Sequence, residues 1–324
     1  MIDQMKVLIG YDGSECAEAA LDDLKRAGLP SKVEAHILSI AEVWLPPPPP
    51  SIYEIVEKAA EVKVPADLQR LYSRTAAIVK EAQSTVKRAK DRLQSAFPEW
   101  KICAKAETGS PAWELISHAE ESRPDLIVVG SHGRSALGRF VLGSISQKVL
   151  AEAKCSVRIA RGRIEDPDEP VRIVVGLDGS PGSLGAVQSL SSRNWPPGSE
   201  VSLVVVIDPW KVPLIGSLVP PLNETIDEEN RAETEYAGRI AAQAEAMLDG
   251  LSLKVKKVLR EGDPKQELPR FAEEWGADCI FVGSTGFSNR FERVVLGSVS
   301  AAVAARAHCS VEVVRSNLTD PKVE

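Results

Sequence analysis

Short apolar runs alternate with longer amphipathic stretches along the whole chain. In the first half, these runs predict five strands, at 7–10, 35–40, 102–106, 126–130 and 157–160. In the second half they predict five more, at 173–176, 201–207, 254–259, 279–283 and 311–314. Several of the runs are apolar at every position, which is typical of parallel strands that are covered on both faces.

The stretches between the strands carry the periodicity of helices. Apolar residues recur at steps of three or four within 78–93 and again within 236–251, so each stretch predicts a helix with one buried face. Ser110 and Asp263 each precede a proline, an arrangement that favours the start of a helix. The alternation of strands and helices predicts a doubly wound α/β sheet, with five strands in each half.

The two halves repeat one another in four places and in the same order. The matched segments are 6–14 with 172–180, 125–133 with 278–286, 142–144 with 296–298, and 155–157 with 309–311. We therefore predict two copies of one module: copy one at 1–163, a charged linker with two prolines at 164–170, and copy two at 171–317.

Composition excludes several classes of function. The 324 residues suit two domains of about 150 residues each. With a net charge of −7 and no cluster of Lys and Arg, the chain lacks the basic surface that nucleic acid requires. It has neither a signal-like N-terminus nor an apolar run of about 18 residues. Five cysteines without a C-x-x-C pair indicate free thiols in a reducing compartment. We expect a cytoplasmic protein that binds neither nucleic acid nor a membrane.

A glycine-rich segment follows the fourth predicted strand of copy one. Two residues separate Gly130 from Gly133, and nine more lead to Gly143, which opens the next predicted helix. Glycines let a backbone approach a phosphate closely, and the start of a helix offers free N–H groups and a partial positive charge. Ligands of open α/β sheets bind at the carboxyl ends of the strands. The segment therefore predicts a phosphate site at that edge of the sheet.

Polar side chains are placed to complete this site. Ser144 and Ser146 offer hydroxyl groups, Arg134 offers positive charge, and His132 lies inside the loop. Asp12, at the tip of the first predicted strand, can accept hydrogen bonds from ribose hydroxyl groups. Together with the glycines, these residues predict a nucleotide site.

The combined motifs resemble the universal stress protein family. The resemblance rests on Gly-x2-Gly-x9-Gly-Ser, preceded by Asp-Leu-Ile-Val-Val and by an early Val-Leu-Ile-Gly-Tyr-Asp-Gly-Ser, and the whole chain is similar to the tandem form of that family. It implies a Rossmann-like, five-stranded parallel sheet in the order 3-2-1-4-5 in each copy. It also implies a stress-response protein that binds ATP, or AMP or ADP, with Mg²⁺ as a companion of the nucleotide. The last strands of the copies would pair as an intramolecular pseudo-dimer, and a homodimer of whole chains stays open.

The resemblance also implies roles for individual residues of copy one. Asp12 would meet the ribose or the adenine, and the backbone from Ile37 to Ile40 would flank the base. The residues that would hold the ribose and the phosphates are Gly130, Gly133, Gly143, Ser144 and Ser146.

Copy two departs from this pattern. Gly283 and Gly286 keep their spacing, but ten residues separate Gly286 from Gly297, and Glu292 stands where copy one has Gly138. An added residue and an acid near the expected anion predict a weaker or altered second site. Its residues would be Asp178, Gly283, Gly286, Gly297, Ser298 and Ser300.

The sequence predicts no catalytic and no metal-ligating residues. It contains no legible Ser-His-Asp, Cys-His or paired-carboxylate constellation, and no Gly-x4-Gly-Lys-Ser/Thr loop. We therefore interpret the chain as a nucleotide-binding regulatory protein with an unidentified protein partner, and slow ATP hydrolysis could accompany binding. Two alternatives stay open. One is an ATPase or adenylyl-transfer enzyme of the same superfamily, and the other is a ligand-free scaffold whose glycines serve tight turns.

Overall fold

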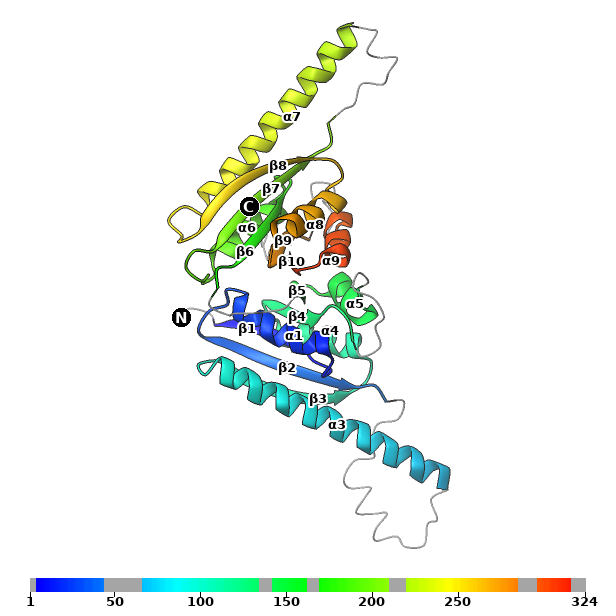
Figure 1. Ribbon diagram of the computed structural model, residues 1–324. Coiled ribbons are helices and arrows are strands. Elements are labelled where there is room, and N and C mark those ends of the chain that lie inside the picture. The colour runs from blue at the N-terminus through cyan, green and yellow to red at the C-terminus, as the bar shows by residue number, and fades with distance from the viewer. Residues whose placement is uncertain are drawn as a thin grey trace, which may run out of the picture.

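The computed structural model describes residues 4–43, 66–133, 142–161, 169–209, 220–284 and 296–315. Within them, ten strands form one sheet in the order β3-β2-β1-β4-β5-β10-β9-β6-β7-β8 (Figure 1). The strands of copy one are β1 (Met5–Gly10), β2 (Val33–Ala41), β3 (Lys101–Thr108), β4 (Leu126–Gly130) and β5 (Ser156–Ala160). Those of copy two are β6 (Arg172–Leu177), β7 (Glu200–Ile207), β8 (Lys254–Glu261), β9 (Cys279–Gly283) and β10 (Ser310–Val314).

Each half of the sheet is parallel, and the predicted fold class is confirmed. Counted from the first strand of each copy, the order reads 3-2-1-4-5 in both. The two halves meet where β5 pairs with β10, and this pair is antiparallel. The last strands of the two copies thus join as expected for a pseudo-dimer. Most of the predicted linker, 164–168, lies outside the described residues.

Helices cover both faces of the sheet. Copy one contributes α1 (Glu15–Asp23), the 3-10 turn η1 (Leu24–Arg26), α3 (Ala66–Ala96), α4 (Pro111–Ser122) and α5 (Ser144–Glu152). Copy two contributes α6 (Pro181–Ser191), α7 (Pro220–Ala246), α8 (Pro264–Trp275) and α9 (Ser298–Arg306). The long helices α3 and α7 lie along the outer strands and extend beyond the sheet at its two ends (Figure 1).

Several helices begin where capping residues predict. The Ser14 hydroxyl accepts a hydrogen bond from the Ala17 N–H at 3.2 Å, and the Asp263 carboxylate accepts one from the Lys265 N–H at 3.0 Å. Ser110 occupies the N-cap position of α4, but its side chain makes no capping hydrogen bond. The proline that follows it is therefore the residue that favours a helix start here.

Three apolar cores hold these layers together. One lies beneath α1 and α3, and its counterpart in copy two lies beneath α6 and α7. The third lies on the opposite face, beneath α4, α5, α8 and α9, and it continues across the β5–β10 seam through Val157, Ile159, Val311 and Val313. The two copies therefore share one core on that face.

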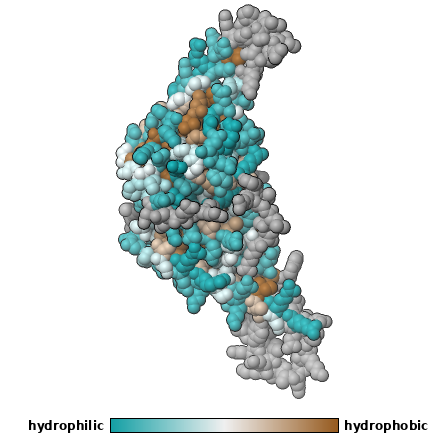
Figure 2. Space-filling model, in the orientation of Figure 1, coloured by the Kyte–Doolittle hydropathy of each residue, from teal (hydrophilic) through white to brown (hydrophobic). Residues whose placement is uncertain are grey.

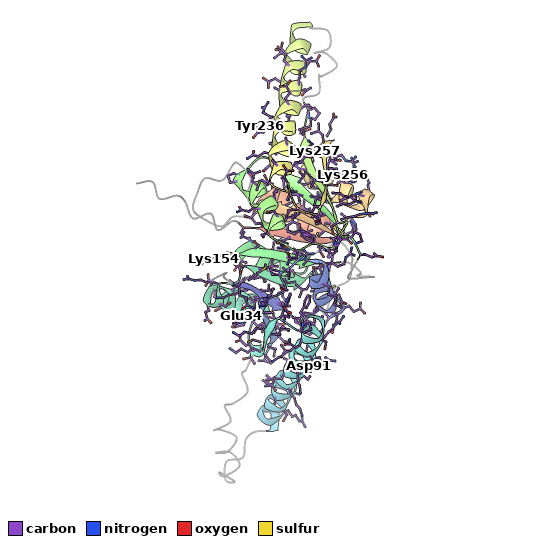
Figure 3. All side chains as sticks on the ribbon, turned by 90° about the vertical axis from the view of Figure 1, so that its left-hand side faces the viewer. Glu34, Asp91, Lys154, Tyr236, Lys256 and Lys257 are labelled. Carbon is purple, nitrogen blue, oxygen red and sulfur yellow. The ribbon has the colours of Figure 1, made fainter. Side chains whose placement is uncertain are left out.

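Most charged groups lie on the outside. The described surface is mainly hydrophilic in the view of Figure 2, with small scattered hydrophobic areas. Asp91, Lys154, Lys256 and Lys257 are exposed at the periphery (Figure 3). Lysines on an edge strand such as β8 discourage another strand from pairing there. No helix in the described ranges is both long and apolar enough to cross a membrane.

Candidate functional site

A cavity of about 430 Å³ opens at the carboxyl ends of β1, β2 and β4 in copy one. It lies there because parallel strands bring all of their carboxyl ends to one edge, where the chain leaves the sheet on either side. The lining includes Asp12, Gly130, His132, Gly133 and Ser146. Five residues that the sequence predicts for one site therefore meet in one cavity.

Copy two has an equivalent cavity of about 390 Å³. Asp178, Gly283, Gly297, Ser298 and Ser300 line it, at the carboxyl ends of β6 and β9 and at the start of α9. The predicted residues of the second site are thus also brought together. Gly286 and Glu292 lie outside the described residues, as does Arg134 of copy one.

The aspartates sit in matched turns at the tips of β1 and β6. Asp12 Oδ1 accepts a hydrogen bond from the Ser14 N–H at 3.0 Å. Asp178 Oδ1 accepts bonds from both the N–H and the hydroxyl of Ser180, at 2.9 and 2.5 Å. The glycine that follows each aspartate has a φ near +78°, where a side chain would be strained, so the turn itself requires glycine. These turns orient a carboxylate toward the cavity mouth in both copies.

The glycines of the loop serve different purposes. A Cβ on Gly130 would lie 2.8 Å from the carbonyl oxygen of Cys16, so glycine lets β4 pack against the start of α1. Gly283 stands equally close to Gly182 in copy two. A Cβ on Gly133 would instead meet Asp12 Oδ2 at 3.1 Å, at the cavity itself. Gly130 and Gly283 therefore have a packing role whatever the cavity binds.

A pair of hydrogen bonds holds the start of α5 against the end of β4. The Gly143 N–H donates to the Ser131 carbonyl at 2.8 Å, and the Ser146 hydroxyl donates to the Gly130 carbonyl at 2.7 Å. Copy two repeats the second bond, from the Ser300 hydroxyl to the Gly283 carbonyl at 2.5 Å. The sequence suggests these serine hydroxyls as donors to phosphate. In the structure each hydroxyl instead donates its proton to the carbonyl of the glycine that ends the preceding strand.

The helices α5 and α9 begin without a side-chain cap. Their N-cap residues are Gly143 and Gly297, and neither helix start receives a side-chain hydrogen bond. In contrast, Ser14 and Ser180 cap the neighbouring helices α1 and α6. An uncapped helix start leaves backbone N–H groups open, and here they face the cavities. Each copy thus presents a place for an anion.

His132 adds a neutral imidazole to the cavity of copy one. Its Nδ1 lies 3.0 Å from the Ser131 hydroxyl, and within the described ranges its buried Nε2 has no hydrogen-bond partner. Burial, with a smaller contribution from the Arg161 cation, lowers the pKa of His132 below its ordinary value. The imidazole is therefore uncharged at neutral pH and can exchange one hydrogen bond with a ligand.

The side of the cavity away from the loop is mainly apolar, with Ser39, Glu42 and Glu81 as its polar members. Leu38, Ile40 and Ala41 line it from the end of β2, and Ile78 and Ala82 line it from α3. These two helix residues are not among the predicted site residues, although Ile78 and Ala82 begin the apolar stripe that predicts the helix. Tyr11, also part of the lining, donates its hydroxyl to Glu18, and burial together with this carboxylate raises the pKa of the phenol.

The side chain of Ile37 is 1% exposed and lies in the core beneath α1 and α3, so it does not line the cavity. That the backbone at 37–40 flanks a base stays a prediction, and Leu38, Ser39 and Ile40 of this segment line the cavity. Side chains alternate between the two faces of a strand, and β2 continues to Ala41, one residue beyond the predicted end. The chain that borders the cavity is therefore 38–42.

The two cavities differ on this apolar side. In copy two, Leu177, Val204 and Val206 line it, and among the described residues α7 contributes none. In copy one, α3, the equivalent helix, supplies part of the wall. Within the described ranges, no group of three or more His, Cys, Asp or Glu side chains could hold a metal ion.

Both halves of the chain match the same family of known proteins. The model of the universal stress protein family matches residues 5–161 and 171–315. A universal stress protein of Mycobacterium tuberculosis is 26% identical over 321 residues, covering 97% of this chain and 98% of the relative. One from Mycolicibacterium smegmatis is 34% identical over 192 residues, but the match spans only 59% of this chain and 61% of that protein.

A solved structure shows the same fold over the full length. The universal stress protein of Archaeoglobus fulgidus aligns with a TM-score of 0.60 at 18% identity, covering 97% of this chain and 99% of that one. The likeness therefore extends over both copies and the seam between them.

Proposed function

Because this chain belongs to the universal stress protein family, we propose that it is a regulatory protein that binds an adenine nucleotide (ATP, ADP or AMP) in the cavity of copy one. The observation that carries the proposal is the uncapped start of α5, which opens into a cavity with an apolar wall on its other side. The five free cysteines support a cytoplasmic location, where thiols stay reduced.

The base, ribose and phosphates of a nucleotide each match the polarity of one part of this cavity. The wall formed by Leu38, Ile40 and Ile78 suits a flat, apolar base. Asp12, at the tip of β1, is in place to accept hydrogen bonds from ribose hydroxyl groups. The N–H groups at the start of α5 are in place for phosphate. A volume of about 430 Å³ lies within the usual range of ligand pockets, about 300 to 1,000 Å³.

We propose that copy two is a second, weaker nucleotide site. The uncapped start of α9 and the cavity of about 390 Å³ support binding there. One difference argues for lower affinity, because α7 adds no described residue to the wall. We expect fewer contacts to the base.

Slow hydrolysis of ATP is a second candidate function. It is favoured by His132, whose unpartnered Nε2 lies at the cavity and is neutral at pH 7, so that it could accept a proton from water. Turnover near 1 s⁻¹ or faster, about the lower end for typical enzymes, would establish an enzyme. Turnover far below that rate would leave binding as the function.

Equilibrium dialysis of the full chain against ATP, ADP and AMP, with and without Mg²⁺, tests the proposal. We expect Gly143→Val to weaken the tighter site at least about tenfold. A Cβ at this position already lies 3.3 Å from His132 Cα, so a branched side chain must move the loop. Gly297→Val makes the matched change in copy two and should leave the tighter site intact.

Circular dichroism of both variants checks that they fold, which separates lost binding from lost structure. Unchanged affinity in folded Gly143→Val would refute the assignment of the loop. Absence of nucleotide binding by the wild-type chain at saturating concentrations would favour the ligand-free scaffold instead.

A further inference from the structure

The seam between the two copies contains a pair of buried opposite charges. Arg158 of β5 is 1% exposed, and Glu312 of β10 is fully buried. The antiparallel register sets these two residues directly opposite each other, between the apolar pairs Val311–Ile159 and Val313–Val157. Arg158 Nη1 lies 3.3 Å from Glu312 Oε2.

Each of these charges is also held within its own copy. Arg158 donates two hydrogen bonds to Asp23, the last residue of α1. One runs from Nε to Oδ2 at 2.5 Å and the other from Nη2 to Oδ1 at 3.0 Å. Glu312 pairs with Arg193, which follows α6 and whose guanidinium stacks over the ring of Phe281. Two local ion pairs therefore meet at the seam, and the Arg158–Glu312 contact links them.

Polar bonds on the same face also cross the seam. The Arg193 Nη1 group donates to the Ala27 carbonyl at 2.8 Å, and the Ser310 hydroxyl lies 2.6 Å from Asp23 Oδ1. The Arg26 guanidinium lies 3.0 Å from the Asp278 carboxylate. These contacts require a residue of copy one on one side and a residue of copy two on the other.

The internal repeat determines which pairings of the copies would bring like charges together at the seam. Arg158 and Glu312 occupy the same place in the two copies, directly after the matched Cys-Ser-Val segments. If copy one paired with another copy one in the same register, Arg158 would face Arg158. If copy two paired with itself, Glu312 would face Glu312. Like charges brought together in a buried site are strongly unfavourable, whereas opposite charges fix the choice of partner.

We propose that Arg158 and Glu312 act as a charge code by which the last strand of copy one accepts only that of copy two. The apolar residues Val157, Ile159, Val311 and Val313 drive association and would do so in any combination, because they are similar in both copies. The charges decide which combination forms. The partner of each surface is the other half of this chain, and two chains do not dimerise through like halves. This selection does not depend on nucleotide.

Cleavage of the full chain tests the code. A protease site placed within 164–168, in the proposed linker, allows the folded chain to be cut between its copies. The cut protein is unfolded in urea and refolded, and native mass spectrometry then counts the three pairings of halves. We expect one-of-each pairs, with fewer than about one complex in ten made of two like halves. Like pairs near the random share of roughly one half, or halves that fail to re-associate, would overturn the proposal.

A double variant separates charge from shape. Arg158→Met combined with Glu312→Gln removes the two facing charges and keeps side chains of similar length. After the same cut and refolding, we expect like pairs to rise several-fold toward the random share. If this variant still formed only one-of-each pairs, shape or the other polar contacts across the seam would be choosing the partner, and the charge code would be wrong.

Discussion

Arg161 and Arg315 follow the last strands of copy one and copy two, at matched places in the repeat, yet their surroundings differ. Arg315 reaches across the seam and donates to the Leu150 carbonyl at 2.5 Å and to the Cys155 carbonyl at 3.3 Å. Arg161 is buried to the same degree, but its Nε, Nη1 and Nη2 have no acceptor among the residues that the structure describes. Burial lowers the pKa of both guanidinium groups.

The difference shows that pseudo-symmetry holds for the backbone and not for the side chains. Arg315 places a cation at the last turn of α5, where the carbonyl groups and the negative end of the helix dipole favour it. Copy two thereby supports the helix whose other end opens into the cavity of copy one. Copy one offers no such support to α9 through Arg161. The two halves are equivalent in fold and unequal in what each does for the other.

Reversing one buried charge at the seam should cause the largest loss of stability. Glu312→Arg would place a new cation beside Arg158 and Arg193, with Asp23 as the nearest remaining anion. Breaking a buried ion pair typically costs about 3 to 5 kcal/mol, so we expect a loss of at least that size. Urea denaturation measures it. Glu245→Arg, which reverses an exposed charge paired with Lys257, is the control and should change stability by about 1 kcal/mol or less.

Removing Arg161 and Arg315 one at a time tests whether their different surroundings change what each contributes to stability. Arg315→Met leaves two buried carbonyl groups without donors, and we expect it to destabilise the chain by about 1 to 3 kcal/mol. Arg161→Met removes an unpartnered buried cation and should be neutral or stabilising. Denaturation midpoints compare the variants directly. Equal losses would show that Arg161 finds partners in solution that match those of Arg315.

The smallest effect is expected from pH, and it should fall on copy one. Burial lowers the pKa of His118 and of His132 in the folded chain, so the native state binds protons less readily than the unfolded state. The stability that these histidines contribute is therefore complete above the unfolded pKa of about 6.5 and is lost as the pH falls below it.

Denaturation midpoints at pH 7.5 and 5.5 test this expectation. His132→Gln should reduce the loss of stability on acidification by less than about 1 kcal/mol, because the side chain is only partly buried. His308→Gln, the same change at an exposed histidine of copy two, serves as the control. An equal reduction in both variants would mean that the effect is not local to His132.

The framework of the fold could be predicted because it depends on local pattern. The run 126–130 is apolar throughout, and β4 has the predicted bounds because all five residues are buried. Helix ends were less predictable. The periodicity of 236–251 continues past Ala246, where α7 ends, because Leu248 stays buried in the turn that follows. Gly250, with a φ of +82°, then turns the chain toward β8.

The site could be predicted in part, since motifs mark which segments meet but not how side chains are used. The aspartates and loop glycines reach the cavities because strand tips and helix starts must meet at one edge of a parallel sheet. The role of Ser146 depends on where the Gly130 carbonyl points, which no local pattern specifies. Arg158 and Glu312 are typical of exposed positions in a sequence, and only the pairing of β5 with β10 buries them.

The antiparallel seam also changes how this molecule can evolve. In a symmetric homodimer, every substitution at the interface is introduced on both sides at once, and a residue on the axis must tolerate its own duplicate. Once the two copies share a polypeptide, a substitution enters one side alone. Arg158 opposite Glu312 is a difference of this one-sided kind. Arg315 and Arg161 are the same residue, and only their surroundings differ. Fusion thus allows the two copies to differ at their shared interface.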